Sequence, residues 1–321
     1  MPERRHSGPA VVTGGAGAIG SAVVERLLRD GREVRVVDNF ATGRREQLPS
    51  DPHLSVTECD LGAGLPPAEV FRGAEEVWHL AANANIPLGT QDPRIDLANG
   101  TLATFHVLEQ ARRQEVRRFV FSSSSVVYGI ASVLPTPESY GPLAPESLYG
   151  AGKLGAEGLV SAYAHCYGLT GYILRFANIV DGRMNHGILY DFFEKLRTDP
   201  KRLEVLGDGR QAKSYLRTED CVEGMLVVSR RAEEPVNIFN LGSEGQTSVR
   251  TIAAKVVAAH GGEAEIVYTG GDRGWVGDVP RQRLAIDKVR GLGWQPSGTS
   301  DQAIDRTIDE LLARRGLPRR G

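Results

Sequence analysis

Short runs of hydrophobic, β-branched residues alternate along the first half of the chain with longer stretches in which hydrophobic residues recur at helical spacing. Runs of the first kind are typical of buried strands, and the longer stretches are typical of amphipathic helices. Regular alternation of the two predicts a parallel sheet covered by helices on both faces, a Rossmann-like, doubly wound α/β fold. The pattern predicts helices at 19–29 and 97–114 and strands at 10–13, 33–37, 54–57, 76–80 and 118–122.

The pattern changes in the second half of the chain. A helix is predicted at 148–167 and a strand at 172–176, and loops rich in Gly and Asp then separate shorter elements. Residues 236–242 are strand-like and could return to the first sheet. We therefore expect a larger first domain over residues 1–177 and a smaller α/β domain over 178–321.

The composition excludes several classes of protein. With 38 Lys+Arg against 40 Asp+Glu, the chain lacks the positive charge of a dedicated nucleic-acid binder. Cys59, Cys166 and Cys221 show no CxxC spacing, so neither a disulfide framework nor a metal site is predicted. The apolar run after the basic residues 1–8 is too short for a signal peptide, and no run of about 18 apolar residues occurs. We expect a cytoplasmic protein without metal, nucleic-acid or membrane partners.

Glycine is over-represented, at 38 of 321 residues, or about 12% against a usual ~7%. Three glycines of the stretch TGGAGAIG, which are Gly14, Gly17 and Gly20, join the first strand to the first helix. Such a turn lets the backbone N–H groups of a helix N-terminus approach a pyrophosphate. The glycine-rich turn alone is weak evidence, because turns without a ligand also use glycine.

Asp38 strengthens the case for a dinucleotide, because it ends the second strand 18 residues after Gly20. A carboxylate there accepts hydrogen bonds from the adenosine ribose and repels a 2′-phosphate, which favours NAD. Arg44 and Arg45 nearby leave NADP open. Dinucleotides bind at the carboxyl ends of parallel strands, which adds as candidate cofactor-binding residues Ala18, Ile19, Asn39, Thr42, Gly43, Asp60, Leu61, Leu80, Ala81 and Ala82. For Asp60 and the small pair 81–82, a turn carboxylate and close packing are the ligand-free alternatives.

Tyr149 and Lys153 lie four residues apart on a predicted helix and so share one face. A free tyrosine has a pKa of ~10, and a lysine cation together with a charged nicotinamide ring would favour the phenolate. The YxxxK pattern also occurs by chance in many helices. Residues 122–125 are serines at the end of the fifth strand, which brings their hydroxyls to the same edge of the sheet. A serine-rich turn is common as well, but the combination in this order predicts an active site.

The chain resembles the extended short-chain dehydrogenases/reductases, and within them nucleotide-sugar epimerases of the UDP-glucose 4-epimerase type. The resemblance spans nearly the whole chain and includes TGGAGAIG, VVDNFATGRRE, CDL, HLAA, FSSSSVVYG, YGAGK, LRFANIVDGR, GDGRQAKSY, FNLG and RGWVGDVP. It implies an NAD-binding Rossmann-like domain, a small C-terminal domain for the nucleotide sugar, and a homodimer formed through two helices of each subunit.

The resemblance also implies roles for individual residues. The catalytic trio would be Ser124, Tyr149 and Lys153. Further contacts to the cofactor are implied for Asn99 and Ser122, with Asn99 supporting the lysine or a water. Contacts to the nucleotide sugar are implied for Ser125, for Asn178 at the pyrophosphate and for Asp278 near the uridine ribose.

The chain departs from the family pattern at several positions. Val180-Asp181-Gly182 stands where relatives often have Tyr-Gly-Pro. Lys213 replaces an arginine, so a phosphate contact there lacks the bidentate fork. An arginine expected at Trp275 is displaced to Arg273, which becomes the candidate phosphate contact. His186 is a candidate sugar contact, and a histidine that only stabilises the loop is its alternative.

The serine loop discriminates among reactions. Related 4,6-dehydratases carry an Asp–Glu pair where this chain has Ser125 and Val126, and UDP-glucuronate decarboxylases usually carry glutamate at Val126. Without such groups, acid–base elimination is disfavoured. The prediction is 4-epimerisation: Tyr149 takes the proton of the sugar 4-hydroxyl through Ser124, hydride leaves for NAD⁺, and the transient 4-keto sugar takes it back on its other face.

Other functions stay open at this stage. They are a nucleotide-sugar reductase or dehydrogenase, a decarboxylase, and an NAD-binding regulator without catalysis. The sugar is also open: UDP-glucose and UDP-galactose are the default, with UDP-glucuronate and UDP-N-acetylhexosamine as alternatives. Gln282, where relatives set the room for the C2 substituent, is smaller than tyrosine and leaves bulkier sugars open.

Overall fold

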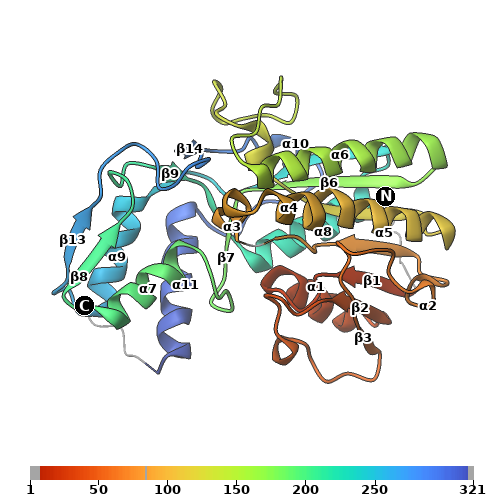
Figure 1. Ribbon diagram of the computed structural model, residues 1–321, viewed down its shortest axis with the longest axis horizontal. Coiled ribbons are helices and arrows are strands. Elements are labelled where there is room, and N and C mark those ends of the chain that lie inside the picture. The colour runs from red at the N-terminus through yellow and green to blue at the C-terminus, as the bar shows by residue number, and fades with distance from the viewer. Residues whose placement is uncertain (1–7, 84, 317–321) are drawn as a thin grey trace.

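The computed structural model describes residues 8–83 and 85–316 and shows two lobes side by side (Figure 1). The prediction for the basic N-terminal stretch falls largely on residues outside this range. One lobe, called here the sheet lobe, contains most of the first half of the chain. The other, called the small lobe, is built from later segments (Figure 1). Within the described residues, no helix combines the length and apolar character needed to cross a membrane.

A seven-stranded parallel sheet forms the centre of the sheet lobe, in the order β11-β6-β5-β4-β1-β2-β3. Its strands are β1 (Ala10–Thr13), β2 (Val34–Asp38), β3 (Leu54–Glu58), β4 (Glu76–His79), β5 (Arg118–Ser124), β6 (Thr170–Phe176) and β11 (Val236–Leu241). The strand order reverses at β1, whose neighbours are β2 and β4. The Rossmann-like α/β fold predicted from the alternation is therefore confirmed, and ligands are expected beyond the carboxyl ends of the strands near this reversal.

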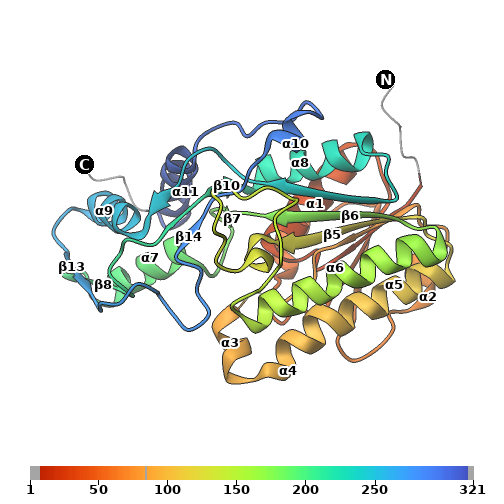
Figure 2. The ribbon, with the colours of Figure 1, turned by 90° about the horizontal axis from the view of Figure 1, so that it is seen from above.

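Helices cover both faces of the sheet, so the lobe has three layers (Figure 2). One hydrophobic core lies under α1 (Ala18–Arg29), α8 (Thr218–Arg231) and α10 (Asp287–Arg290). The other lies under α2 (Ala68–Phe71), α5 (Ala103–Arg113) and α6 (Leu148–Tyr167). Because both faces are covered, central strands such as β1 are completely buried, which explains their near-continuous hydrophobic sequence.

The helix predicted over 97–114 is interrupted at its start. Short helices α3 (Ile86–Gln91) and α4 (Pro93–Asp96) lead into a π-helical turn, η2 (Leu97–Leu102), before α5 begins. Gly152 of α6 allows this segment to approach closely, since a Cβ at Gly152 would lie 2.9 Å from the Asp96 backbone oxygen. Thr101 Oγ1 also donates a hydrogen bond to the Gly152 carbonyl at 3.2 Å. The segment that leaves the regular helical period is therefore the one that packs against α6.

The small lobe has its own hydrophobic core. Helices α7 (Ile188–Thr198), α9 (Val249–His260) and α11 (Ser300–Arg314) pack with a pair of parallel strands, β8 (Arg202–Val205) and β13 (Glu265–Tyr268). Strands β7 (Asn178–Val180) and β10 (Tyr215–Arg217) form a second parallel pair. Short strands β9 (Ala212–Lys213), β12 (Thr247–Ser248) and β14 (Arg281–Gln282) make a third sheet. The 3₁₀ turns are η1 (Arg45–Gln47) and η3 (Ser125–Tyr128).

Candidate active site

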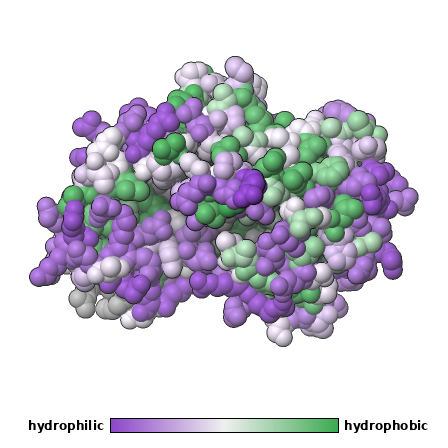
Figure 3. All heavy atoms as spheres, viewed as in Figure 1, coloured by the Kyte–Doolittle hydropathy of each residue, from purple (hydrophilic) through white to green (hydrophobic). Residues whose placement is uncertain are grey.

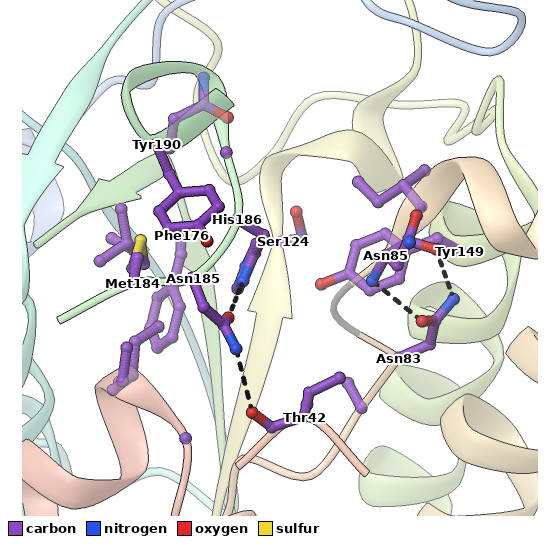
Figure 4. A pocket seen from close by; sticks show the side chains of 18 of the residues that line it. Thr42, Asn83, Asn85, Ser124, Tyr149, Phe176, Met184, Asn185, His186 and Tyr190 are labelled. Atoms are coloured by element: carbon purple, nitrogen blue, oxygen red, sulfur yellow. Dashed lines mark hydrogen bonds between the residues drawn. The ribbon is translucent and has the colours of Figure 1, made fainter. Parts of the chain in front are cut away.

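A cavity of about 1040 Å³ is lined by residues of both lobes. On the sheet-lobe side its lining lies beyond the carboxyl ends of β1, β2, β4 and β5. This volume reaches the upper end of the ~300–1,000 Å³ that ligand cavities usually span. Figure 4 shows Tyr149 and Asn83 on one side of this space, with Asn185, His186 and Tyr190 facing them from the other side. All the candidate cofactor-binding residues named above line this one cavity.

The glycine turn after β1 forms a cradle with no room for side chains at two of its three positions. Gly14 has φ +67, and a Cβ there would lie 2.6 Å from the Ala81 backbone nitrogen. A Cβ at Gly20 would lie 2.0 Å from the Gly14 oxygen. Gly17 differs, because its hypothetical Cβ meets only the Gly14 oxygen, at 3.3 Å, and otherwise points into open space. Gly17 therefore leaves space for a ligand at the N-terminus of α1, whose N-cap has no capping side chain.

Asp38 lies beside this cradle at the end of β2 and is 7% exposed. Its carboxylate accepts hydrogen bonds from the backbone N–H groups of Ala16, at 2.9 Å, and Phe40, at 2.8 Å. These bonds fix the carboxylate on the cavity wall, where its remaining lone pairs can accept from a ribose. The arginines that left NADP open do not line the cavity, and Arg45 instead lies over the Phe40 ring. The cradle and this carboxylate together fit a dinucleotide without a 2′-phosphate.

Helix α6 carries Tyr149 and Lys153 in its first turns, and its start is fixed by Ser147. The Ser147 hydroxyl accepts a hydrogen bond from the Gly150 N–H at 3.1 Å, as an N-cap does. Lys153 is 3% exposed and donates to the Ser122 carbonyl at 2.6 Å. Its Nζ lies 5.8 Å from the centre of the Tyr149 ring, on the same helix face. Both residues line the cavity, as their spacing predicted.

Burial shifts both pKa values away from those of the free side chains. Desolvation lowers the pKa of Lys153 to about 7, opposed by the nearby carboxylate of Glu157. Desolvation and the negative charge of Asp96 raise the pKa of Tyr149 to about 12, while a hydrogen bond with Ser124 acts in the opposite direction. The protein groups alone therefore do not produce the phenolate that the sequence favoured. A further positive charge is needed for Tyr149 to act as a base.

The serines at the end of β5 have different surroundings. Ser122 anchors Lys153, and Ser124 lines the cavity on the same side as Tyr149 (Figure 4). Ser123 donates to the Glu157 carboxylate at 2.5 Å, which also pairs with Arg175 at 2.7 Å. Ser125 is only 4% exposed and does not line the cavity, because the 3₁₀ turn that follows β5 directs it into the protein. The contact between Ser125 and the sugar nucleotide that the resemblance implied has no support in this geometry.

Asn178, Lys213 and Asp278 line the small-lobe part of the cavity. Lys213 Nζ lies 2.5 Å from an Asp278 carboxylate oxygen and 4.9 Å from the centre of the Trp275 ring. Arg273 does not line the cavity, because it is turned outward and pairs with Glu146 at 3.0 Å. Trp275 and Lys213 therefore line this part of the cavity, and Arg273 does not.

Two further candidates from the sequence have distinct positions. Gln282 is 7% exposed and does not line the cavity, since it lies behind Asn178 and accepts its hydrogen bond at 3.4 Å. Asn178, which lines the cavity, is the side chain that connects Gln282 to it. His186 lines the cavity on the side opposite Tyr149 and is exposed to solvent (Figure 4).

Several residues at the cavity were not predicted from the sequence. Asp96 is 3% exposed and accepts from the Asn83 side chain at 2.9 Å, while its second oxygen finds no partner among the described residues. Gln47, Arg183 and Asn185 line the cavity, whereas Asp96 is not part of its lining. Their positions depend on contacts between segments that are distant in the sequence, so no local pattern predicts them. Among the described residues, no group of His, Cys, Asp and Glu is arranged to hold a metal ion.

A parallel sheet with a dinucleotide cradle, together with a tyrosine and a lysine on one helix face, defines an enzyme of the extended short-chain dehydrogenase/reductase class. Comparison with known proteins agrees with this class. The model of the NAD dependent epimerase/dehydratase family matches residues 10–242. The chain belongs to this family, and NAD is its cofactor.

Three relatives illustrate the range within the family. A UDP-glucose 4-epimerase of Mycolicibacterium smegmatis is 31% identical over 316 residues, which cover 93% of this chain and 97% of the relative. UDP-glucuronic acid decarboxylase 2 of Arabidopsis thaliana is 31% identical over 317 residues, covering 95% of this chain and 68% of the relative. A crystal structure of a UDP-galactose 4-epimerase is 39% identical, with a TM-score of 0.84, and covers 96% of this chain and 99% of that chain.

Proposed function

We propose that this enzyme interconverts the C4 epimers of a nucleotide sugar, with UDP-glucose and UDP-galactose as the first pair to test. The observation that carries the proposal is the position of Ser124, Tyr149 and Lys153 on one cavity wall that also includes Val126. Val126 has no proton to give or take, so this wall offers one proton-transferring phenol and no second acid–base pair. Epimerisation needs no more than that.

The chain's own residues would divide the work as follows. Bound NAD supplies a reversible acceptor for two electrons from the sugar carbon and, in its oxidised form, a positively charged ring. Tyr149 takes the proton from the sugar 4-hydroxyl at its phenol oxygen and later returns it. Ser124 lies in the hydrogen-bond path to that phenol. Lys153, anchored on Ser122, would add a positive charge in its protonated form, and that charge would favour the phenolate.

The cavity would hold cofactor and sugar nucleotide in its two parts. The cradle and Asp38 would bind NAD at the pyrophosphate and the adenosine ribose. Asn178, Lys213 and Asp278 would bind the nucleoside diphosphate of the substrate, and His186 the sugar. Lys213 is the cation of this group and would meet phosphate as a single point charge.

Decarboxylation of UDP-glucuronate is the second candidate, since decarboxylases are as similar to the chain as the M. smegmatis epimerase is. One assay separates the functions. The holoenzyme is incubated with UDP- and dTDP-sugars, including UDP-glucuronate and UDP-N-acetylhexosamines, and products are resolved by NMR. Inverted C4 with no net change in NADH absorbance supports the proposal. Loss of CO₂, or stoichiometric gain or loss of NADH, would instead identify a decarboxylase or a reductase.

We also propose that two copies pair through α5 and α6. Leu102 and Phe105 near the start of α5, and Leu148 and Tyr167 on α6, are 39–57% exposed. Hydrophobic residues gather on this face of the sheet lobe, over both helices (Figure 3). Such a face is typical of an interface between subunits. Light scattering of the intact protein and of Phe105→Glu tests it, with a shift from dimer to monomer expected.

Two further expectations remain proposals. We propose that residues 1–177, with β11, form the NAD-binding domain and residues 178–321 the nucleotide-sugar domain. We also propose a cytoplasmic location, because the three cysteines are free thiols. Limited proteolysis and cell fractionation test the two statements.

A further inference from the structure

The segment from Asp181 to Gly187 joins β7 to α7, so it belongs to the small lobe. We call it the strap. It is nevertheless fastened to the sheet lobe at separate points along its length. Asn185 Nδ2 donates to the Thr42 carbonyl at 3.3 Å (Figure 4). The other two fastenings involve Arg183, through an ion pair with Glu25 of α1 at 3.1 Å and a hydrogen bond from Gln47 Nε2 to its carbonyl at 3.3 Å.

The strap is also braced within its own lobe. Asp181 is 5% exposed and accepts hydrogen bonds from the Arg183 backbone N–H, at 2.7 Å, and from its guanidinium, at 3.3 Å. The Gly182 N–H donates to Glu310 of α11 at 3.0 Å. A Cβ at Gly182 would lie 2.7 Å from the Glu310 Cβ, so glycine is needed for this approach. Val180-Asp181-Gly182, where the chain departs from the family pattern, thus begins a strap that is held in place on α11, and the guanidinium of Arg183 points toward α1.

The strap lies over the part of the cavity that fits the dinucleotide. Thr42 and Gln47, which it contacts, line the cavity together with Gly17 and Asp38 of the cradle. Arg183, Met184 and Asn185 line the same cavity from the strap side. A dinucleotide in the cradle would therefore lie between the sheet lobe and the strap, and we expect its release to require the strap contacts to open.

We propose that the strap retains NAD between turnovers, and that Arg183 and Asn185 are the residues through which it does so. The three fastenings are hydrogen bonds or a partly exposed ion pair, each weak alone and additive when separate. Each uses a different partner residue in the sheet lobe, so each can be weakened by its own substitution, and the double variants measure how far the two that share Arg183 are coupled. The inference rests on NAD as the cofactor and not on which sugar the enzyme converts.

The test is the dissociation rate of NAD from the holoenzyme, without any sugar present. Protein carrying labelled NAD is mixed with a large excess of unlabelled NAD, and retained label is followed with time. Glu25→Gln removes the charge of one fastening, Gln47→Met and Asn185→Ala each remove the hydrogen bond of another, and all three leave the glycines of the cradle unchanged. Each is expected to release NAD about 3–10 times faster, and two together about 10–100 times faster.

Asp30→Asn is the matched control. Asp30 caps the other end of α1 and pairs with Arg230 at 2.6 Å, so the variant removes a comparable pair on the same helix. Its NAD release is expected to equal that of the parent protein. Unchanged release in all three strap variants would overturn the proposal, as would equal acceleration in Asp30→Asn. Because no sugar is present, failure of the epimerase assay would leave this result standing.

Discussion

The two walls of the cavity are built in different ways. On the sheet-lobe wall, functional groups stand at strand ends or on a buried helix, and Asp38 and Lys153 are 7% and 3% exposed. On the small-lobe wall they stand on short strands and on loops, and their exposure is uneven: Asp278 is 3% exposed and Trp275 is 39% exposed. Chemistry that needs fixed geometry and shifted pKa values lies on the rigid wall, while binding and retention fall to the loop wall. Changes on the first wall should therefore have larger effects than changes on the second.

The largest effect is expected for Tyr149→Phe, which removes the proton-accepting oxygen from the rigid wall. Turnover should fall by about 10³-fold or more, because phenylalanine has no oxygen to take the proton and Lys153 is held on the Ser122 carbonyl. NAD content should remain near that of the parent protein, measured by absorbance after denaturation. Tyr163→Phe, which removes a phenol from the same helix outside the cavity, is the control. Turnover above a tenth of the parent's in Tyr149→Phe would contradict the proposed role.

Glycine substitutions compare the cradle with an ordinary turn. Gly14→Ala and Gly31→Ala both place a side chain at positive φ, but only Gly14 is crowded, by the Ala81 backbone. An added Cβ at Gly31 meets nothing within 4 Å. We expect Gly14→Ala to lower the free energy of unfolding by about 2–4 kcal/mol and to lose NAD, and Gly31→Ala to cost about 1 kcal/mol. Urea unfolding measures both, and equal losses would show that the cradle is not specially constrained.

Lys153→Met tests how much the buried ammonium of Lys153 lowers the free energy of unfolding. The folded pKa of Lys153, about 7, lies below the ordinary 10.5, so the folded state binds fewer protons than the unfolded state between these pH values. Burial of the charge therefore lowers stability most below pH 7, and this loss fades as the pH rises toward 10.5. In protein stripped of NAD, Lys153→Met should be about 1–3 kcal/mol more stable at pH 7, which allows for the lost bond to Ser122, and should show no such gain near pH 10.

Urea unfolding at the two pH values checks this prediction. Lys255→Met, in the small lobe, controls for the general loss of a lysine charge. A stability gain in Lys153→Met that is equal at both pH values would contradict a desolvated ammonium as its cause.

The smallest effect is expected for Asp96→Asn, which removes a buried negative charge that acts on Tyr149. Asp96 helps to raise the pKa of Tyr149, so loss of its negative charge should lower that pKa. The phenol must lose its proton to act as a base, so the rising limb of turnover against pH should move to lower pH, by about one unit or less. Asparagine can still accept the bond from Asn83. The pH profile of turnover measures the shift, with Asp92→Asn, on the exposed start of α4, as the control. An unmoved profile would contradict the electrostatic role of Asp96.

Local patterns in the sequence predicted most of the sheet lobe. The strands near 10–13, 33–37 and 118–122 and the helix at 148–167 appear within a few residues of their expected limits. Hydrophobic runs and helical spacing are local properties, so they can be read without the tertiary structure. The helix predicted from residue 97 begins with a π-helical turn instead of regular α-helix. Gly100 and Thr101 of this turn contact α6, and such a contact cannot be predicted from the local spacing of hydrophobic residues.

The candidate site was predicted less evenly. Residues tied to a strand end or a helix face, such as Asp38, Tyr149 and Lys153, line the cavity where their spacing placed them. Predictions that rested on position in a loop were less accurate: Ser125 and Arg273 do not line the cavity. A loop's side-chain directions depend on its neighbours in space, and these are not encoded in spacing.

The sequence by itself determined the parallel sheet, the glycine turn and the shared helix face of Tyr149 and Lys153, because each follows from backbone geometry over a few residues. The tertiary structure alone decided the direction of the pKa shifts at that pair, since burial and the charge of Asp96 arise only on folding. It also decided that Asn185 and Arg183 reach back to Thr42 and Glu25, across more than a hundred positions of chain. Contacts over such separations form only when the whole chain has packed.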